Sequence, residues 1–204
     1  MAYGDLTLAQ GTPPDEVAEI IQRMSIGRRN GLLDALAAYG AGLNDEAILR
    51  RFLAFLDEPD PFRRFHPAGH VTASAVVARP SGESVLLVFH RKLDRWLQPG
   101  GHVEAGDPSV FAAALREAQE ETGIRTFEAP IGDAILDLDI HPIPSYGTDP
   151  AHLHYDVRFL LTTGDGEVPS AGAAWFSFGD VREVDTDGSL ARAVGKAATR
   201  LGAR

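Results

Sequence analysis

After residue 66, short runs rich in β-branched and apolar residues lie on both sides of one amphipathic helix. Runs of this composition, separated by turn residues, predict strands. Strands around a central helix, with further helices at both ends of the chain, predict an α/β fold with a mixed sheet. The predicted strands are residues 71–78, 85–90, 96–97, 135–140, 152–163 and 173–178, and the last predicted helix is 189–201.

The first 66 residues have a different character and predict helices only. Acidic and polar cap residues precede amphipathic stretches, and prolines separate this region from the strands that follow. We therefore predict a helical N-terminal extension over residues 1–66 and a second domain over residues 67–204. The predicted helices cover residues 12–24, 28–39 and 45–57, the last capped by Asn44.

Composition excludes several classes of function. The formal charge of −10 over 204 residues argues against a surface that binds nucleic acid, because phosphate contacts need basic residues. The absence of cysteine excludes disulfides, a thiol nucleophile and a thiolate zinc site. No apolar run reaches membrane-spanning length, and the N-terminus lacks the features of a signal peptide, so we expect a cytoplasmic protein with no membrane partner.

Glu117, Glu120 and Glu121 fall on one narrow face near the end of the central helix. Glu117 and Glu121 form a like-charge i,i+4 pair, which costs a few tenths of a kcal/mol. The helix is predicted to end at Gly123, so these carboxylates also oppose the helix dipole at about 0.3 to 1 kcal/mol each. A bound Mg²⁺ or Mn²⁺ would reverse this repulsion, since both ions prefer oxygen ligands. The alternative is an ordinary solvated helix face.

A glycine-rich loop, residues 98–108, leads into this helix. Asp107 and Ser109 are both candidate N-caps, and Pro108 suits the first helical turn. An apolar stripe lies roughly opposite the glutamates, so one face of the helix is predicted to join a core. That stripe consists of Phe111, Ala114, Leu115 and Ala118.

Together the loop and the helix resemble a Nudix box, the pattern Gly-x5-Glu-x7-Arg-Glu-U-x-Glu-Glu-x-Gly-U, in which U is aliphatic. The spacing differs at one point, because Gly101 and Arg116 are one residue further apart than in the family. The first Glu of the pattern, which supports the start of the helix and pairs with the Arg, is replaced by Asp107 or, with the gap shifted, by Pro108. The matching residues are Gly101, Arg116, Glu117, Ala118, Glu120, Glu121, Gly123 and Ile124.

The resemblance implies a Nudix-type α/β/α sandwich and a Mg²⁺-dependent hydrolase that cleaves a diphosphate linkage in a nucleoside diphosphate derivative. It implies that Glu117, Glu120, Glu121 and the Gly101 carbonyl hold the metal. Glu120, Glu121 and Arg116 are the implied catalytic residues, with Arg116 orienting the carboxylates. The alternative is a noncatalytic Nudix-like module that binds a nucleotide as a sensor. A small nucleotide-type molecule is the expected partner, and a homodimer is compatible with the sequence.

Two regions are candidates for substrate binding. Arg91, Arg95 and Trp96 precede the glycine loop and would hold a diphosphate and stack on a base. The alternative is a turn with solvated cations and Trp96 in the core.

The second region is the strand with His152, His154 and Asp156, which alternate on one face. This face, continued by Arg158, either lines the substrate cleft or lies solvated on an edge strand. His154 is also a candidate base. The His-x-His-x-Asp spacing is similar to part of a metallo-β-lactamase zinc site. We disfavour that interpretation because Val157 stands where that family has a histidine and no histidine follows residue 154.

Overall fold

Strand β1, Gly69–Ala78, is buried along its whole length and lies at the centre of the sheet. The structure is a computed structural model that describes residues 14–40, 46–91, 93–184 and 188–203. Successive side chains of a strand point to opposite faces, so a strand buried at every residue requires cover on both faces. The valines and alanines of β1 are small enough for helices to pack closely on each side.

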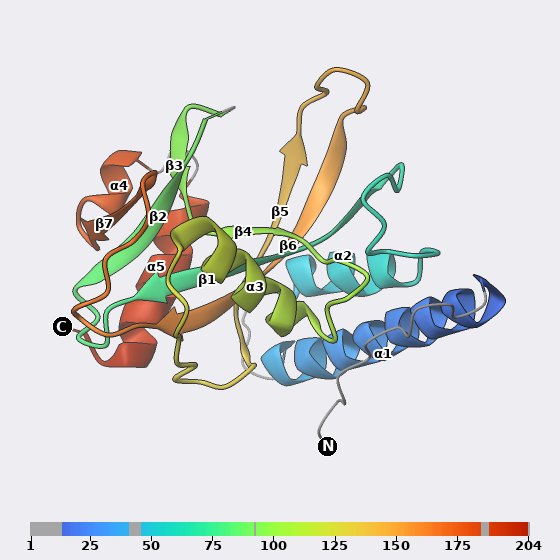
Figure 1. Ribbon diagram of the computed structural model, residues 1–204, viewed down its shortest axis with the longest axis horizontal. Helices are drawn as coiled ribbons and strands as arrows, with labels where there is room; N and C mark the ends of the chain where they lie inside the picture. The colour runs from blue at the N-terminus through green and yellow to red at the C-terminus, as the bar shows by residue number, and fades with distance from the viewer. Residues whose placement is uncertain (1–13, 41–45, 92, 185–187, 204) are drawn as a thin grey trace.

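The sheet is mixed, as the sequence predicts. Its seven strands follow the order β3-β2-β1-β6-β5, with β4 paired to β1 and β7 paired to β2. β1 and β6 run parallel, whereas the other pairings between described strands are antiparallel. Figure 1 shows β2 and β3 diverging from β5 and β6 on the two sides of β1. The strands other than β1 are β2 Ser84–His90, β3 Arg95–Leu97, β4 Gly100–His102, β5 Ile135–Ile143, β6 His152–Thr162 and β7 Ala173–Ser177.

Helices cover both faces of the sheet and complete the predicted α/β/α arrangement (Figure 1). On one face, α1 (Pro14–Gly40), α2 (Ala47–Leu56) and α3 (Val110–Thr122) pack against side chains of β1 and β6. On the other face, α4 (Val181–Val184) and α5 (Ser189–Leu201) pack on the opposite residues of the same strands. None of the described helices is long and apolar enough to span a bilayer.

The structure corrects the predicted helix boundaries near the N-terminus. α1 is one continuous helix, whereas the sequence predicts a break between Met24 and Arg28. A glycine such as Gly27 costs about 1 kcal/mol in a helix interior. Burial of Leu32 and Leu36 in the hydrophobic core offsets that cost. The predicted helix start at residue 12 and the predicted Asn44 cap lie outside the described residues.

Two short elements, β4 and α4, are absent from the prediction. β4 consists of Gly100, Gly101 and His102, and glycine has a low preference for strands. It forms because Thr72, Ala73 and Ser74 of β1 pair with it, a long-range contact that local composition does not reveal.

The N-terminal helices share a hydrophobic core with the sheet. The ring of Phe55 on α2 stacks on that of Tyr155 on β6, with centroids 3.9 Å apart. Phe52 meets the same tyrosine edge-on at 5.4 Å, and Leu36 of α1 is fully buried in this cluster. The division into an extension over residues 1–66 and a domain over residues 67–204 stays a prediction.

Candidate active site

Helix α3 begins and ends at residues that the sequence indicates. Ser109, rather than Asp107, is the N-cap, and its Oγ accepts a hydrogen bond from the Ala112 amide at 3.1 Å. Gly123 ends the helix in the left-handed conformation, with a φ of 72°. The buried side of the helix contains Val110, Ala113, Ala114, Ala118 and Thr122, so the glutamates lie on the other side.

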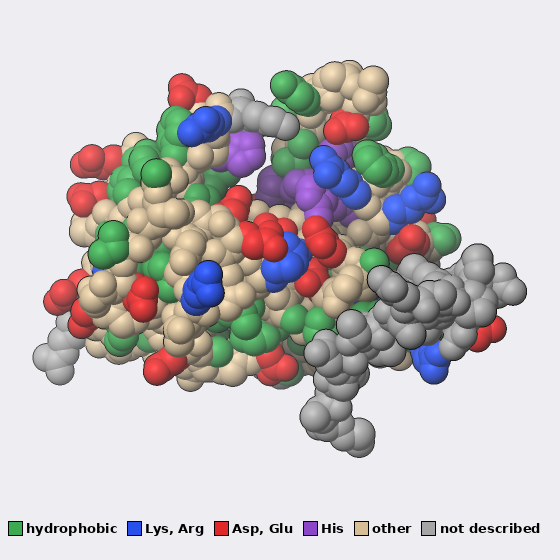
Figure 2. Space-filling model, in the orientation of Figure 1, with side chains coloured by type: hydrophobic (Ala, Val, Ile, Leu, Met, Phe, Trp, Pro, Cys, Tyr) green, Lys and Arg blue, Asp and Glu red, His purple; other side chains and the backbone are tan. Residues whose placement is uncertain are grey.

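Each of the three glutamates has a hydrogen-bond donor beside it. Nη1 of Arg116 donates to Glu117 Oε1 at 2.9 Å and to Glu120 Oε2 at 3.2 Å. The Gly100 amide donates to Glu121 Oε2 at 3.0 Å. Figure 2 shows carboxylates grouped around a basic side chain on this face of the molecule. The helix therefore holds its carboxylates against the backbone of β4.

The electrostatics of this group favour a cation. Desolvation is the largest cause that raises the pKa of Glu117, and neighbouring carboxylates raise it further, while Arg116 opposes both effects. Desolvation also raises the pKa of Glu121, although part of its surface stays in solvent, and the Gly100 amide opposes this shift. Burial is the largest cause of both shifts, so a bound cation would stabilise the charged form of these two carboxylates.

The backbone of β4 comes close to the Glu117 carboxyl group at Gly101. A Cβ at Gly101 would lie 2.7 Å from the Glu117 carboxyl group. The atoms that could coordinate a metal here are carboxylate and carbonyl oxygens, which suit Mg²⁺. Among the described residues, the potential metal-ligand atoms that lie within 4.8 Å of one another belong to three histidines, and the carboxylates of the glutamates are further apart. To bind one cation together, the glutamate carboxylates would therefore have to move closer to one another and away from Arg116.

Asp107 supports the start of the helix. Its Oδ1 accepts from Arg116 Nε at 3.1 Å, and its Oδ2 accepts from Arg116 Nη2 at 3.0 Å and from the Glu104 amide at 2.8 Å. Nη2 of Arg116 also donates to the His102 carbonyl at 2.9 Å. The hydrogen bonds that Arg116 donates to Asp107 are the largest cause that raises the pKa of Arg116. Asp107 thus pairs with Arg116 as the family's Glu does, although its side chain is shorter and Gly101 and Arg116 are one residue further apart than in the family.

Arg28 of α1 is a site residue that the sequence analysis missed. Its Nη1 donates to the carbonyls of Glu104, Ala105 and Asp107 at 3.3, 2.9 and 2.9 Å. The side chain is buried, and burial lowers its pKa. Arg28 lies 79 residues before Asp107, so no motif around the loop includes it. The N-terminal helix therefore anchors the loop that precedes the glutamates.

Replacing Arg28 by methionine should destabilise the protein by about 1 to 3 kcal/mol, because the buried Asp107 carbonyl and two partly buried loop carbonyls lose their donor. Urea unfolding of the variant measures this change. Arg23→Met on an exposed position of the same helix is the matched control and should stay within about 0.5 kcal/mol of wild type. Equal stability of the two variants would show that the loop does not depend on Arg28.

Five histidines share one face of the sheet. His70 on β1 lies opposite His154 on β6, and His154 lies opposite His141 on β5. His152 precedes His154 on the same face, and His102 lies on β4 beside β1. The ring centroid of His70 is 4.9 Å from that of His102, 5.0 Å from that of His152 and 4.7 Å from that of His154. The sequence spacing predicts only that His152 and His154 share a face. The strand register shows that His70, His102 and His141 lie on the same face.

Three of these rings, His70, His102 and His154, have pKa values well below the ordinary histidine range. Burial, followed by repulsion from neighbouring histidines, lowers the pKa of His70 to about 3 and that of His154 to about 2. Burial and nearby cations also lower the pKa of His102 to about 4.

A pocket of about 390 Å³ opens beside these rings, between the β2–β3 turn and the β5–β6 connection. Figure 2 shows histidine side chains in a hollow next to the carboxylates. His102 joins the two features, since its ring lines the pocket and its carbonyl accepts from Arg116. The pocket is lined by Arg64, Phe65, His66, His90, Leu93, His102, Ile143, Pro144, Ser145, Tyr146, Asp149, Pro150, His152 and His154.

The structure separates the residues predicted to bind substrate. His154 lines the pocket, whereas Arg91, Arg95 and Trp96 are not among its lining residues. The Trp96 ring lies 5.3 Å from that of Phe89 and 5.0 Å from that of Phe176, and it packs on the core beneath α5. This is the core position that the sequence left as the alternative.

Arg158 requires a correction, because the sequence predicts it beside a phosphate and the structure places it in the interior. Its side chain is 3% exposed. Nε donates to Asp156 Oδ2 at 2.9 Å, and Asp156 also accepts from Thr72 Oγ1 at 3.0 Å and Ser74 Oγ at 2.8 Å. β6 is a central strand between β1 and β5, not an edge strand. Burial and pairing leave this guanidinium no open surface on which to meet a ligand.

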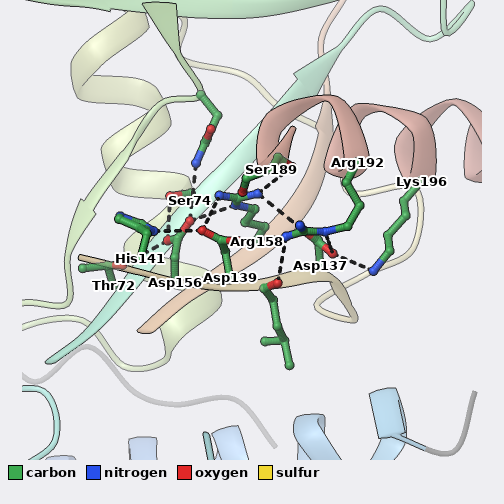
Figure 3. A network of polar contacts seen from close by, with 12 residues as sticks. Thr72, Ser74, Asp137, Asp139, His141, Asp156, Arg158, Ser189, Arg192 and Lys196 are labelled. Carbon is green, nitrogen blue, oxygen red and sulfur yellow. Dashed lines mark hydrogen bonds and ion pairs between the residues drawn. The ribbon is translucent and has the colours of Figure 1, made fainter. Parts of the chain in front are cut away.

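The same face continues into a buried network of ion pairs (Figure 3). Arg158 lies 3.4 Å from Asp137 and 3.3 Å from Asp139, both on β5. Helix α5 adds Arg192, at 2.9 Å from Asp137, and Lys196, at 2.6 Å from the same aspartate. The network therefore links the sheet to α5 behind the histidines.

Comparison with known proteins identifies the family. A family model described as a NUDIX domain matches residues 68–194, more than half of the chain. The chain belongs to the Nudix family. The uncharacterized Nudix hydrolase NudL of Citrobacter koseri is 41% identical over 63 residues, which span 28% of this chain and 32% of that protein.

A solved structure shares the fold. The Ap4A hydrolase of C. elegans superposes with a TM-score of 0.51 at 19% identity, over 64% of this chain and 97% of that one. At this identity the likeness establishes the α/β/α fold and not the substrate.

Proposed function

We propose that this Nudix protein is a Mg²⁺-dependent hydrolase that cleaves a diphosphate linkage in a nucleoside diphosphate derivative. The observation that carries the proposal is the set of carboxylates that α3 holds against β4, where two of them have raised pKa values. A fold-level likeness alone would not assign an activity, since one fold serves many functions. Here the presence of all three glutamates of the Nudix box supports a hydrolase over a noncatalytic nucleotide-binding module.

Glu117, Glu120, Glu121 and the Gly101 carbonyl would hold the metal, with Mn²⁺ as a substitute. When bound, Mg²⁺ neutralises the charge that accumulates around phosphorus and polarises the attacking water. The glycine at position 101 allows the backbone to come close to Glu117.

The protein side chains would position the reactants. Arg116 contacts two of the glutamates and Asp107, so it orients the carboxylates and does not need to touch the substrate. The reaction itself is the attack of a water oxygen on one phosphorus and the breaking of the bridging P–O bond. Glu120, whose side chain is 61% exposed, would accept the proton of that water, because the lowered pKa of His154 makes that imidazole a weak base.

The pocket next to the carboxylates suits the remainder of a nucleotide. Phe65 and Tyr146 present rings that are 65% and 67% exposed, which suits stacking on a base. Arg64 adds a cation for a phosphate. Arg91 and Arg95 remain predicted contacts outside this pocket.

Turnover of a nucleotide panel tests the function. The panel contains nucleoside triphosphates, dinucleoside polyphosphates and nucleotide sugars, each incubated with Mg²⁺, with Mn²⁺ and with a chelator. We expect metal-dependent release of a nucleoside phosphate from at least one class and none with the chelator. Tight nucleotide binding without hydrolysis at any Mg²⁺ or Mn²⁺ concentration would instead support the noncatalytic sensor.

A further inference from the structure

A histidine site lies on the pocket side of the sheet, apart from the glutamates. Side-chain nitrogens of His70, His152 and His154 all lie within 4.8 Å of one another. His70 comes from β1 and the other two from β6, which pairs with β1 in parallel. The strand pairing, which is rigid, therefore sets the relative positions of the three rings.

His70 is the residue that most requires a ligand. It is fully buried, and neither ring nitrogen has a hydrogen-bond partner among the residues that the structure describes. A buried polar group without a partner costs about 1 to 3 kcal/mol. Most buried side chains avoid that cost, so an unpartnered ring surrounded by other imidazoles indicates a missing ligand.

His152 shows which nitrogen would bind. Its Nδ1 lies 2.8 Å from the Pro150 carbonyl oxygen. A carbonyl only accepts hydrogen bonds, so Nδ1 carries the proton and the lone pair is on Nε2. Metal-binding histidines commonly donate their second ring N–H to a carbonyl in this way, which orients the ring.

We propose that His70, His152 and His154 form a binding site for a transition-metal ion such as Zn²⁺, with one coordination position open toward the pocket. Imidazole nitrogens suit Zn²⁺, Cu²⁺ and Ni²⁺, whereas Mg²⁺ requires oxygens. Three histidines and an open fourth position are the ligand set of a catalytic rather than a structural zinc site. His152 and His154 line the pocket, so the fourth position faces it.

The distances are compatible with metal binding after a small inward movement. Zn²⁺ binds nitrogens at about 2.0 to 2.1 Å, which places tetrahedral ligand atoms about 3.3 Å apart. The three nitrogens lie within 4.8 Å of one another, so the rings would have to move inward to hold the ion. The proposed site differs from the His-x-His-x-Asp pattern of a metallo-β-lactamase. Asp156 accepts a hydrogen bond from Arg158 in the buried network, and the third ligand here is the buried His70.

Zn²⁺ binding to the full chain tests the site without any measurement of hydrolysis. Metal-free protein is titrated with Zn²⁺ alone in excess Mg²⁺ by calorimetry, and bound metal is counted after dialysis. We expect one equivalent in wild type. In His152→Ala and His154→Ala the affinity should fall by at least about 100-fold, since even an outer-shell partner is worth about 10- to 100-fold. A visible spectrum of bound Co²⁺ then reports nitrogen ligation.

Two controls separate this site from the glutamates. His90→Ala removes another histidine that lines the pocket and should leave Zn²⁺ binding unchanged. The Glu117→Gln, Glu121→Gln double variant should also keep it. The proposal is overturned if folded His152→Ala, checked by circular dichroism, binds Zn²⁺ as wild type does, or if only the glutamate variant loses the metal. Because the readout is binding, failure of the hydrolase assignment would not affect this result.

Discussion

Replacing Glu121 by glutamine should lower turnover of a diphosphate substrate by about 10²- to 10³-fold, and Glu117→Gln should have a similar effect. A bound metal contributes several kcal/mol of charge stabilisation in the transition state, and each 1.36 kcal/mol is tenfold in rate. Glutamine keeps the shape of glutamate but removes the charge that attracts the cation. The measurement is kcat and kcat/KM over a range of Mg²⁺ concentrations, with the substrate that the nucleotide panel identifies.

The control for this experiment is Glu128→Gln, which changes an exposed carboxylate outside the glutamate face. It should retain the wild-type rate. Thermal unfolding of all variants shows whether a lost rate reflects a lost fold. If Glu117→Gln and Glu121→Gln both match wild type on a good substrate, the assignment of the metal to these carboxylates is wrong.

Replacing Arg158 by methionine should reduce the free energy of unfolding by about 3 to 5 kcal/mol, because it leaves the buried Asp156 carboxylate without its cation. Asp156 is 1% exposed, so water cannot replace the guanidinium there, whereas Asp137 keeps Arg192 and Lys196 as partners. Typical domains are stable by about 5 to 15 kcal/mol, so this loss is a large fraction of the total. Urea unfolding with a two-state fit measures it.

Two further variants make the experiment specific. Arg182→Met removes an exposed arginine and should change stability by less than about 0.5 kcal/mol. The double variant Asp156→Leu, Arg158→Met removes both charges of one pair and should recover part of the loss, since an apolar pair often replaces a buried ion pair at little cost. If Arg158→Met lowered the free energy of unfolding by less than about 1 kcal/mol, the stability of the ion-pair network would not depend on this residue.

The local elements of the fold were predictable from the sequence. Ser109 was one of two candidate caps, Gly123 was the expected helix end, and α5 was predicted with its observed bounds, Ser189–Leu201. Caps, end signals and helical periodicity depend on neighbours within a few residues, so the sequence shows them directly. The alternation along β6 likewise predicted that His152 and His154 share a face.

Contacts between distant segments were not predictable in this way. The pairing of Arg28 with the loop, the ion pairs of Arg158 and the strand β4 all join residues far apart in the chain. The glycines of β4 have little strand preference of their own. Arg158 alternates with apolar residues just as a cleft residue would, and only the position of α5 shows that it is covered.

The sequence by itself determined the family resemblance, the glutamate face of α3 and the positions of most strands along the chain, because each depends on the pattern within one segment. Only the tertiary structure decided which histidines meet, since His70 lies 84 residues from its partner across the sheet, His154. A strand register that differs by one residue would turn His70 to the opposite face. The lack of a histidine at Val157 and after residue 154 disfavours a zinc site in the sequence, whereas the parallel pairing of β1 with β6 supplies the third nitrogen.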